Sequence, residues 1–290
     1  VEQGRFVPVA YQFDELDEHG MVWFEGSEFA MAGDAGQLDQ ADQLLMMLTD
    51  AGPQAPATLH PAQGSIVADI AVARNCHFYL VEGNRQRSQN YYVAHDIDNG
   101  MTRTALYELN VEPENELNWL YLGYQGYQGD GSIIDTLKMR MSAGVLSRFT
   151  RMSLDNHNLR PKQVGHLLGP IRSVMHLRTK VVLAGIPVMT IQVQAMRYAA
   201  HYEAHAFARI PDLYRATLKD PEVAVTVDGN AQIGARVYTA GFADKPVTVD
   251  GKIDDADKRF ANQSLSMHEN WILFESRKQF SLLTAMTVPD

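Results

Sequence analysis

The sequence predicts an α+β fold, mostly antiparallel β, with a helical segment around residues 161–219 and an extended N-terminal arm. Three observations lead to this prediction. Strand-like runs dominate from residue 65 onward. Apolar residues at helical spacing follow Pro161. Residues 1–64 hold eleven acidic residues and one basic residue. We therefore divide the chain into an acidic N-terminal arm with a short helix, 1–64, and a single α+β domain, 65–290.

The arm begins with an extended run over residues 5–13, in which Pro8 excludes a central strand position. Leucine and alanine recur at helical spacing over residues 37–49, which predicts a short helix that Gly52 and Pro53 end. A proline-containing linker then leads to the domain.

From Ser65 the pattern favours β-structure. Residues 65–74 and 77–82 are expected to be strands. Asn99-Gly100 lies between residues 91–98 and 101–111, and this dipeptide is typical of a two-residue hairpin turn. Near the C-terminus, a hairpin is expected over residues 223–239, and two closing strands over 271–276 and 280–288.

The helical prediction rests on two stretches. Six apolar residues after Pro161 follow i, i+3, i+4 spacing: Val164, Leu167, Leu168, Ile171, Val174 and Met175. Pro170 interrupts this stripe, which predicts two short helices or one kinked helix. The alanine-rich residues 195–209 predict a second helical stretch, and the β-branched run 181–193 between the two predicts a buried strand.

Charge is distributed unevenly along this chain of net charge −10. The window from Lys138 to Lys180 holds nine basic residues and one acidic residue. We expect four arginines to contact an acidic partner surface: Arg148, Arg151, Arg172 and Arg178. The arm of a neighbouring copy offers such a surface: Asp14, Glu15, Asp17 and Glu18. Pairing inside one chain is the alternative. Nucleic acid is a second candidate partner for residues 138–180, although the sequence pI of about 5.4 and the lack of a reader motif argue against it.

His201 and His205 are candidate metal ligands, because two histidines at i and i+4 share one face of a helix. On such a helix Glu203 would point away from both, at about 200° from His201. No third ligand is identified, and the sequence predicts no cofactor. A metal-dependent enzyme that uses the two histidines remains an alternative function. The chain has no Gly-x-Ser-x-Gly elbow and no dinucleotide-binding glycine pattern, so we lean against an enzyme.

One cysteine in 290 residues excludes an internal disulfide, and no apolar run is long enough to span a membrane as a helix. We expect a soluble homo-oligomer. The favoured function is a self-assembling structural subunit, such as a coat, shell or tube protein of a virus-like or phage-like particle, held by contacts between oppositely charged surfaces. A small-ligand-binding protein with a β-barrel-like pocket, lined by methionine and tyrosine, is the third possibility.

Overall fold

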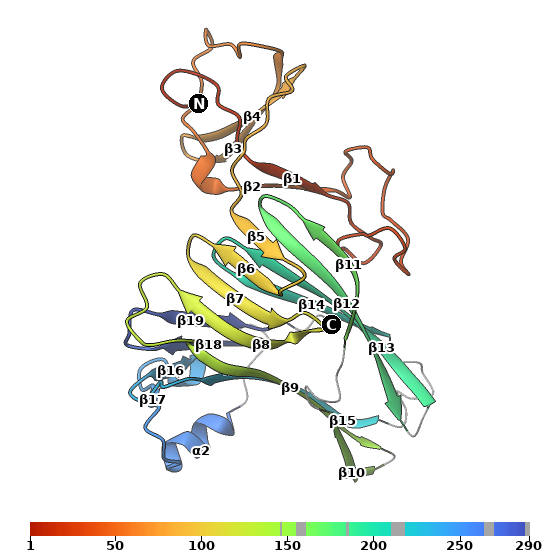
Figure 1. Ribbon diagram of the computed structural model, residues 1–290, viewed down its shortest axis with the longest axis vertical. Helices are drawn as coiled ribbons and strands as arrows, with labels where there is room; N and C mark the ends of the chain where they lie inside the picture. The colour runs from red at the N-terminus through yellow and green to blue at the C-terminus, as the bar shows by residue number, and fades with distance from the viewer. Residues whose placement is uncertain (146, 155–160, 184–185, 210–217, 264–269, 288–290) are drawn as a thin grey trace. The chain divides into compact units, whose positions relative to one another are not determined.

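The protein is built almost entirely from antiparallel β-strands, and the predicted α+β class is wrong. The computed structural model describes residues 1–145, 147–154, 161–183, 186–209, 218–263 and 270–287. Within 161–219 the described residues form β11 to β14 and the start of β15, so the helices expected there are not found (Figure 1). The strand expected over 181–193 falls on the end of β12 and the start of β13. A single α-helix, seven residues long, is found in the described part of the chain.

The described residues form two compact units, which we treat separately. The first unit draws on residues 1–105, 113–116 and the described part of 159–216. Its elements are β1 (Tyr11–Asp14), β2 (Gln43–Met46), the 3-10 helix η1 (Leu48–Asp50), β3 (Ser65–Ala73), β4 (Cys76–Glu82), β5 (Val93–Asp96), β6 (Met101–Thr104), β11 (Lys162–Leu168), β12 (Arg172–Leu183), β13 (Ile186–Tyr198) and β14 (Tyr202–Arg209).

The second unit draws on residues 106–112 and on the described parts of 117–158 and 217–290. Its elements are β7 (Tyr107–Glu112), most of β8 (Asn115–Tyr124), β9 (Ile134–Val145), β10 (Ser147–Leu154), β15 (Leu218–Gly229), β16 (Arg236–Thr239), the 3-10 helix η2 (Ala240–Phe242), β17 (Val247–Thr248), α2 (Asp255–Ala261), β18 (Trp271–Glu275) and β19 (Ser281–Ala285).

The centre of the first unit is a four-stranded antiparallel sheet in the order β11-β12-β13-β14. β12 and β13 pair from Arg172↔Tyr198 to Leu183↔Ile186. Residues 171–177 and 191–197 are buried without a break, so both faces of these strands are covered. Strands that are buried on both faces need not alternate apolar and polar residues. This explains why their apolar residues also satisfied helical spacing.

One face of this sheet is covered by the N-terminal segment of the same chain. Val22 and Phe24 pack on Val174 of β12 and Met196 of β13, and all four side chains are buried. Leu16, Leu167 and Tyr198 pack around this cluster. This apolar cluster therefore attaches the arm to the β11–β14 sheet.

The opposite face carries a buried charge. Arg197 is fully buried and forms an ion pair with Glu116. His95 of β5 lies near this guanidinium, and burial, followed by the positive charge of Arg197, lowers the pKa of His95 to about 3. His95 is therefore neutral in the folded protein at neutral pH, and its Nδ1 lies 2.9 Å from Thr102 Oγ1.

Several of the strands were predicted from the sequence. The strands expected at 65–74 and 77–82 are confirmed as β3 and β4, which pair antiparallel. The closing strands are confirmed as β18 and β19. The hairpin around Asn99-Gly100 is also found, but β5 ends at Asp96, so its loop has four residues instead of two.

Other local predictions fail. The helix expected over residues 37–49 is not found, because this stretch contains the strand β2 and the start of the 3-10 helix η1. The hairpin expected over 223–239 is absent, because β15 pairs with β9 while β16 pairs with β17 and β18. The missed helix is α2, where Asp254 and Asp257 form a reciprocal capping box.

Candidate functional site

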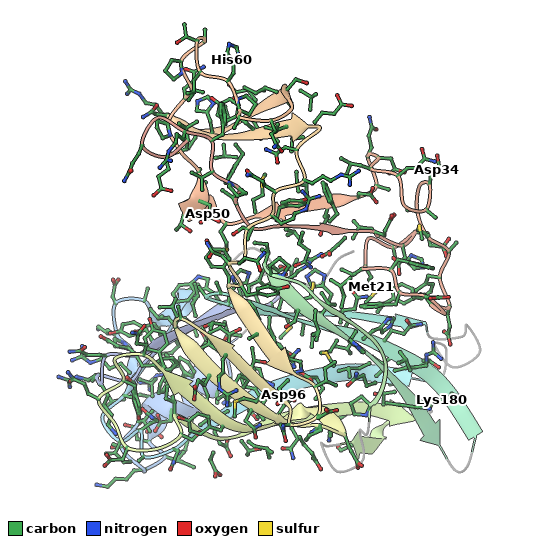
Figure 2. The ribbon with its side chains drawn as sticks, turned by 45° about the horizontal axis from the view of Figure 1, so that its top comes forward. Met21, Asp34, Asp50, His60, Asp96 and Lys180 are labelled. Atoms are coloured by element: carbon green, nitrogen blue, oxygen red, sulfur yellow. The ribbon has the colours of Figure 1, made fainter. Side chains whose placement is uncertain are left out.

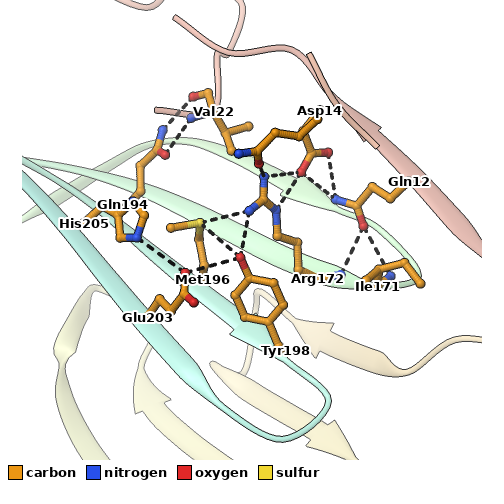
Figure 3. A network of polar contacts seen from close by, with 11 residues as sticks. Gln12, Asp14, Val22, Ile171, Arg172, Gln194, Met196, Tyr198, Glu203 and His205 are labelled. Atoms are coloured by element: carbon orange, nitrogen blue, oxygen red, sulfur yellow. Dashed lines mark hydrogen bonds and ion pairs between the residues drawn. The ribbon is translucent and has the colours of Figure 1, made fainter. Parts of the chain in front are cut away.

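A buried ion pair joins the arm to the β11–β14 sheet in the first unit (Figure 3). Asp14 is 1 % exposed and Arg172 is 4 % exposed. The Nε and Nη2 atoms of Arg172 both lie 2.6 Å from Asp14 Oδ2. The remaining guanidinium hydrogen bonds go to Gln43 Oε1, at 2.9 Å, and to the hydroxyl of Tyr198, at 2.8 Å. The charge of Arg172 is thus satisfied within one chain.

Gln12 extends this contact into the turn between β11 and β12. Its amide nitrogen donates to Asp14 Oδ1 at 2.8 Å, and its carbonyl oxygen accepts from the backbone N–H groups of Ile171 and Arg172. A Cβ added to Gly169 would lie 1.9 Å from Gln12 Oε1. Any larger residue at 169 would therefore displace the Gln12 amide from this contact.

From Arg172 the network continues towards solvent along β13 and β14. The hydroxyl of Tyr198 donates to Glu203 Oε2 at 3.4 Å, and burial raises the pKa of this tyrosine. Glu203 lies between two histidines, with His201 Nε2 3.3 Å from Oε1 and His205 Nε2 3.4 Å from Oε2. The ring of His201 stacks on that of Tyr198, with centroids 4.2 Å apart.

The strand conformation changes the geometry of the two predicted metal ligands. Alternate residues of a strand share a face, so Glu203 lies between the histidines and does not point away from them. In an extended strand, Cα atoms four residues apart are separated by about 13 Å. His201 and His205 each pair with their own carboxylate oxygen. Among the described residues, no group of three or more His, Cys, Asp or Glu side chains has the arrangement of a metal site.

A second set of contacts fixes the arm further along β12 and β13. The buried amide of Gln194 accepts from the Val22 N–H at 2.8 Å and donates to the Val22 carbonyl at 2.6 Å, as a neighbouring strand would (Figure 3). Glu28 lies 3.2 Å from Arg178 and accepts from Gln192 at 3.0 Å. Two of the predicted interface arginines, Arg172 and Arg178, thus meet acidic residues of their own chain.

The other predicted interface residues have separate environments. The side chains of Arg148 and Arg151 lie outside the described part of the structure. Asp17 is buried and accepts from two backbone N–H groups of its own turn. Glu15 accepts from the Gly36 N–H at 2.9 Å, and Glu18 is exposed. The structure therefore brings Asp14 and Arg172 together and leaves Glu18 at the surface.

An apolar groove of about 290 Å³ lies within the first unit. Most residues between 6 and 13 line it, together with parts of β2, η1 and β4 and with Val67. Polar residues that follow β4, as far as Arg87, complete the lining. Four of the aromatic residues that line the groove form two contacting pairs. Phe6 and Tyr79 meet edge to face with centroids 5.3 Å apart, and Tyr11 and Phe13 are 5.5 Å apart. No sequence motif marks this groove, because its lining comes from four separate stretches.

A carboxylate, Asp50, also lines the groove (Figure 2). The hydroxyl of Tyr92 donates to Asp50 Oδ1. Burial and this carboxylate raise the pKa of Tyr92 to about 12, so its hydroxyl remains a donor at neutral pH. The other oxygen, Asp50 Oδ2, is buried and has no hydrogen-bond partner among the residues that the structure describes.

The β3–β4 ribbon beside the groove exposes large aliphatic side chains. β3 pairs only with β4 in its sheet. The register shifts at Val67 and at Val72, as in β-bulges, and these valines are 58 % and 42 % exposed. The one charge on β3, Asp69, lies 2.6 Å from His77 Nδ1 of β4.

Comparisons with protein-family models, with curated proteins and with solved structures found no match for this chain. Within the described residues, no helix has the length and apolarity that a membrane crossing requires.

Proposed function

We propose that this chain is a self-assembling structural subunit, of the kind that builds a coat, shell or tube, and that its contact surface is the β3–β4 ribbon. The observation that supports this proposal is the exposure of Val67 and Val72. β-bulges redirect side chains out of the ladder, so neither valine holds the ribbon together. Ile66, next to Val67 on the same strand, is 37 % exposed as well. Exposed aliphatic surface of this kind typically marks a site of protein association.

The proposed occupant of this surface is a second copy of the chain. An exposed edge strand is normally protected by charges, and β3 carries only Asp69, which is already paired with His77. A two-fold axis places the same ribbon opposite itself, so both partners offer matching apolar side chains. The expected contact is thus apolar and self-complementary.

This proposal differs in its electrostatics from an assembly held by opposite charges. Arg172 and Arg178 already contact Asp14 and Glu28 within one chain. The other acidic residues of the arm give it a negative charge, so the arms of two copies repel each other. Salt screens this repulsion, with a Debye length of ~3 Å at about 1 M. Association through the ribbon should therefore persist or strengthen as salt rises.

The test is the solution mass by light scattering at low salt and at about 1 M salt. We expect a mass that is a multiple of 32.4 kDa at both. Val67→Lys and Val72→Lys should each reduce it, because a buried lysine at an apolar contact has no partner. Ile253→Lys is the matched control, since Ile253 is 82 % exposed and lies in the second unit. A 32.4 kDa monomer at both salt concentrations, or equal effects of all three variants, would refute the proposal.

A further inference from the structure

The groove of the first unit has the chemistry of a binding site for an organic cation, and it shares Val67 and most of β4 with the proposed assembly surface. Its volume of about 290 Å³ is close to the lower end of the range for small-molecule sites. Five aromatic residues contribute to its lining: Phe6, Tyr11, Phe13, Phe78 and Tyr79. Aromatic faces attract cations through their negative quadrupole, and they pack against apolar groups as well.

The same wall already accommodates a cation of this chain. The guanidinium carbon of Arg87 lies 5.3 Å from the centroid of the Tyr11 ring. Arg87 is an exposed residue on the lining, so its charge is largely solvated. The contact shows that the aromatic lining of the groove is accessible to a positively charged, planar group.

Asp50 supplies the anionic partner. One of its oxygens accepts the Tyr92 hydroxyl, and the other has no hydrogen-bond partner among the described residues. An oxygen that is buried without a donor is costly, and a ligand that donates a hydrogen bond removes that cost. Of the Asp, Glu, Lys and Arg side chains on the lining, Asp50 and Glu82 are acidic and Arg87 is basic, so these side chains carry a net negative charge.

We propose that this groove binds a small amine with an apolar body, such as an arylalkyl ammonium ion. The apolar body packs among Phe6, Phe13 and Tyr79, and the ammonium group donates to Asp50. Charge and shape both contribute to selectivity. A carboxylate of the same shape is repelled by Asp50, and a neutral analogue lacks the attraction to the carboxylate.

Calorimetric titration of the full chain with three probes tests this proposal: 2-phenylethylammonium, 2-phenylethanol and 3-phenylpropionate. We expect the ammonium probe to bind and the carboxylate probe to show no binding. Asp50→Asn should weaken binding of the ammonium by at least about tenfold, because it removes a hydrogen bond to a charged group. Asp244→Asn removes the same charge from an exposed site in the second unit and should leave binding unchanged.

A second variant keeps the test decisive if Asp50→Asn does not fold. Tyr11→Leu removes one aromatic face of the groove and keeps its apolar character. It should weaken binding of 2-phenylethylammonium more than binding of 2-phenylethanol. Equal binding of all three probes would show a plain apolar cavity and overturn the proposal. Absence of binding by the ammonium, or equal affinity in the wild type and both groove variants, would overturn it as well.

Discussion

Removal of the Asp14 carboxylate should weaken the attachment of the arm to the β11–β14 sheet. In Asp14→Ala, the guanidinium of Arg172 stays buried and loses both contacts at 2.6 Å. Its hydrogen bonds to Gln43 and Tyr198 remain and offset part of the loss. A hydrogen bond to a charged group contributes about 1.5–3 kcal/mol, and breaking a buried ion pair by deleting one partner costs about 3–5 kcal/mol. We expect the free energy of unfolding of the first unit to fall by about 3–5 kcal/mol.

The assay is urea unfolding combined with hydrogen exchange at the Val22 amide, which reports on the arm directly. Glu18→Ala is the matched control, because Glu18 lies in the same acidic run but is exposed, and it should change stability by less than about 0.5 kcal/mol. Asp14→Leu combined with Arg172→Met should recover much of the loss, since no uncompensated charge remains. If Asp14→Ala and Glu18→Ala had equal effects, the reasoning about a buried anchoring pair would be refuted.

Two further predictions concern buried polar groups of the first unit. Gln194→Ala leaves both backbone groups of Val22 without their partners. It should lower the free energy of unfolding by about 2–3 kcal/mol and speed hydrogen exchange of the Val22 amide. Gln37→Ala, at an exposed site, is the control and should change neither quantity. The pKa of His95 is lowered from 6.5 to about 3, so below pH 6.5 the unfolded chain binds a proton that the folded chain does not, and stability is lost as pH falls from 6.5 towards 3. His95→Asn should therefore flatten the decline in the free energy of unfolding, measured by urea titration between about pH 7 and about pH 5, by at most ~1.4 kcal/mol per pH unit. His60→Asn, at an exposed site, should leave this decline as steep as in the wild type.

Strands with one exposed face were easier to predict than strands with two buried faces. β3 and β4 alternate in burial only partly, but β-branched residues and the short connection at Asn75 identified them. β12 and β13 are buried on both faces, so their sequences lack the alternation that separates a strand from a helix. Alanine favours helices in isolation, yet Ala195 is fully buried in β13, where it pairs with Ala204 of β14.

The anchoring network was partly visible in the sequence, and the groove was not. Opposite charge in the arm and in residues 138–180 predicted that the two would attract, and Asp14 with Arg172 is such a contact within one chain. Composition does not show which acid meets which base, because that depends on the fold. Asp50 and Tyr92 lie 42 residues apart, and neither belongs to a recognisable motif. Their pairing follows only from the tertiary structure.

The anchoring of the arm also has a consequence for the order in which the protein forms during synthesis. Asp14 and Arg172 are 158 residues apart, and Val22 and Gln194 are 172 apart. At about 5–20 residues per second, the arm leaves the ribosome roughly 8–30 s before its partner strand exists. During that interval Val22 and Phe24 have nothing to pack on. The excess of acidic residues in the arm gives the waiting segment a strong negative charge, which opposes aggregation until β12 and β13 emerge.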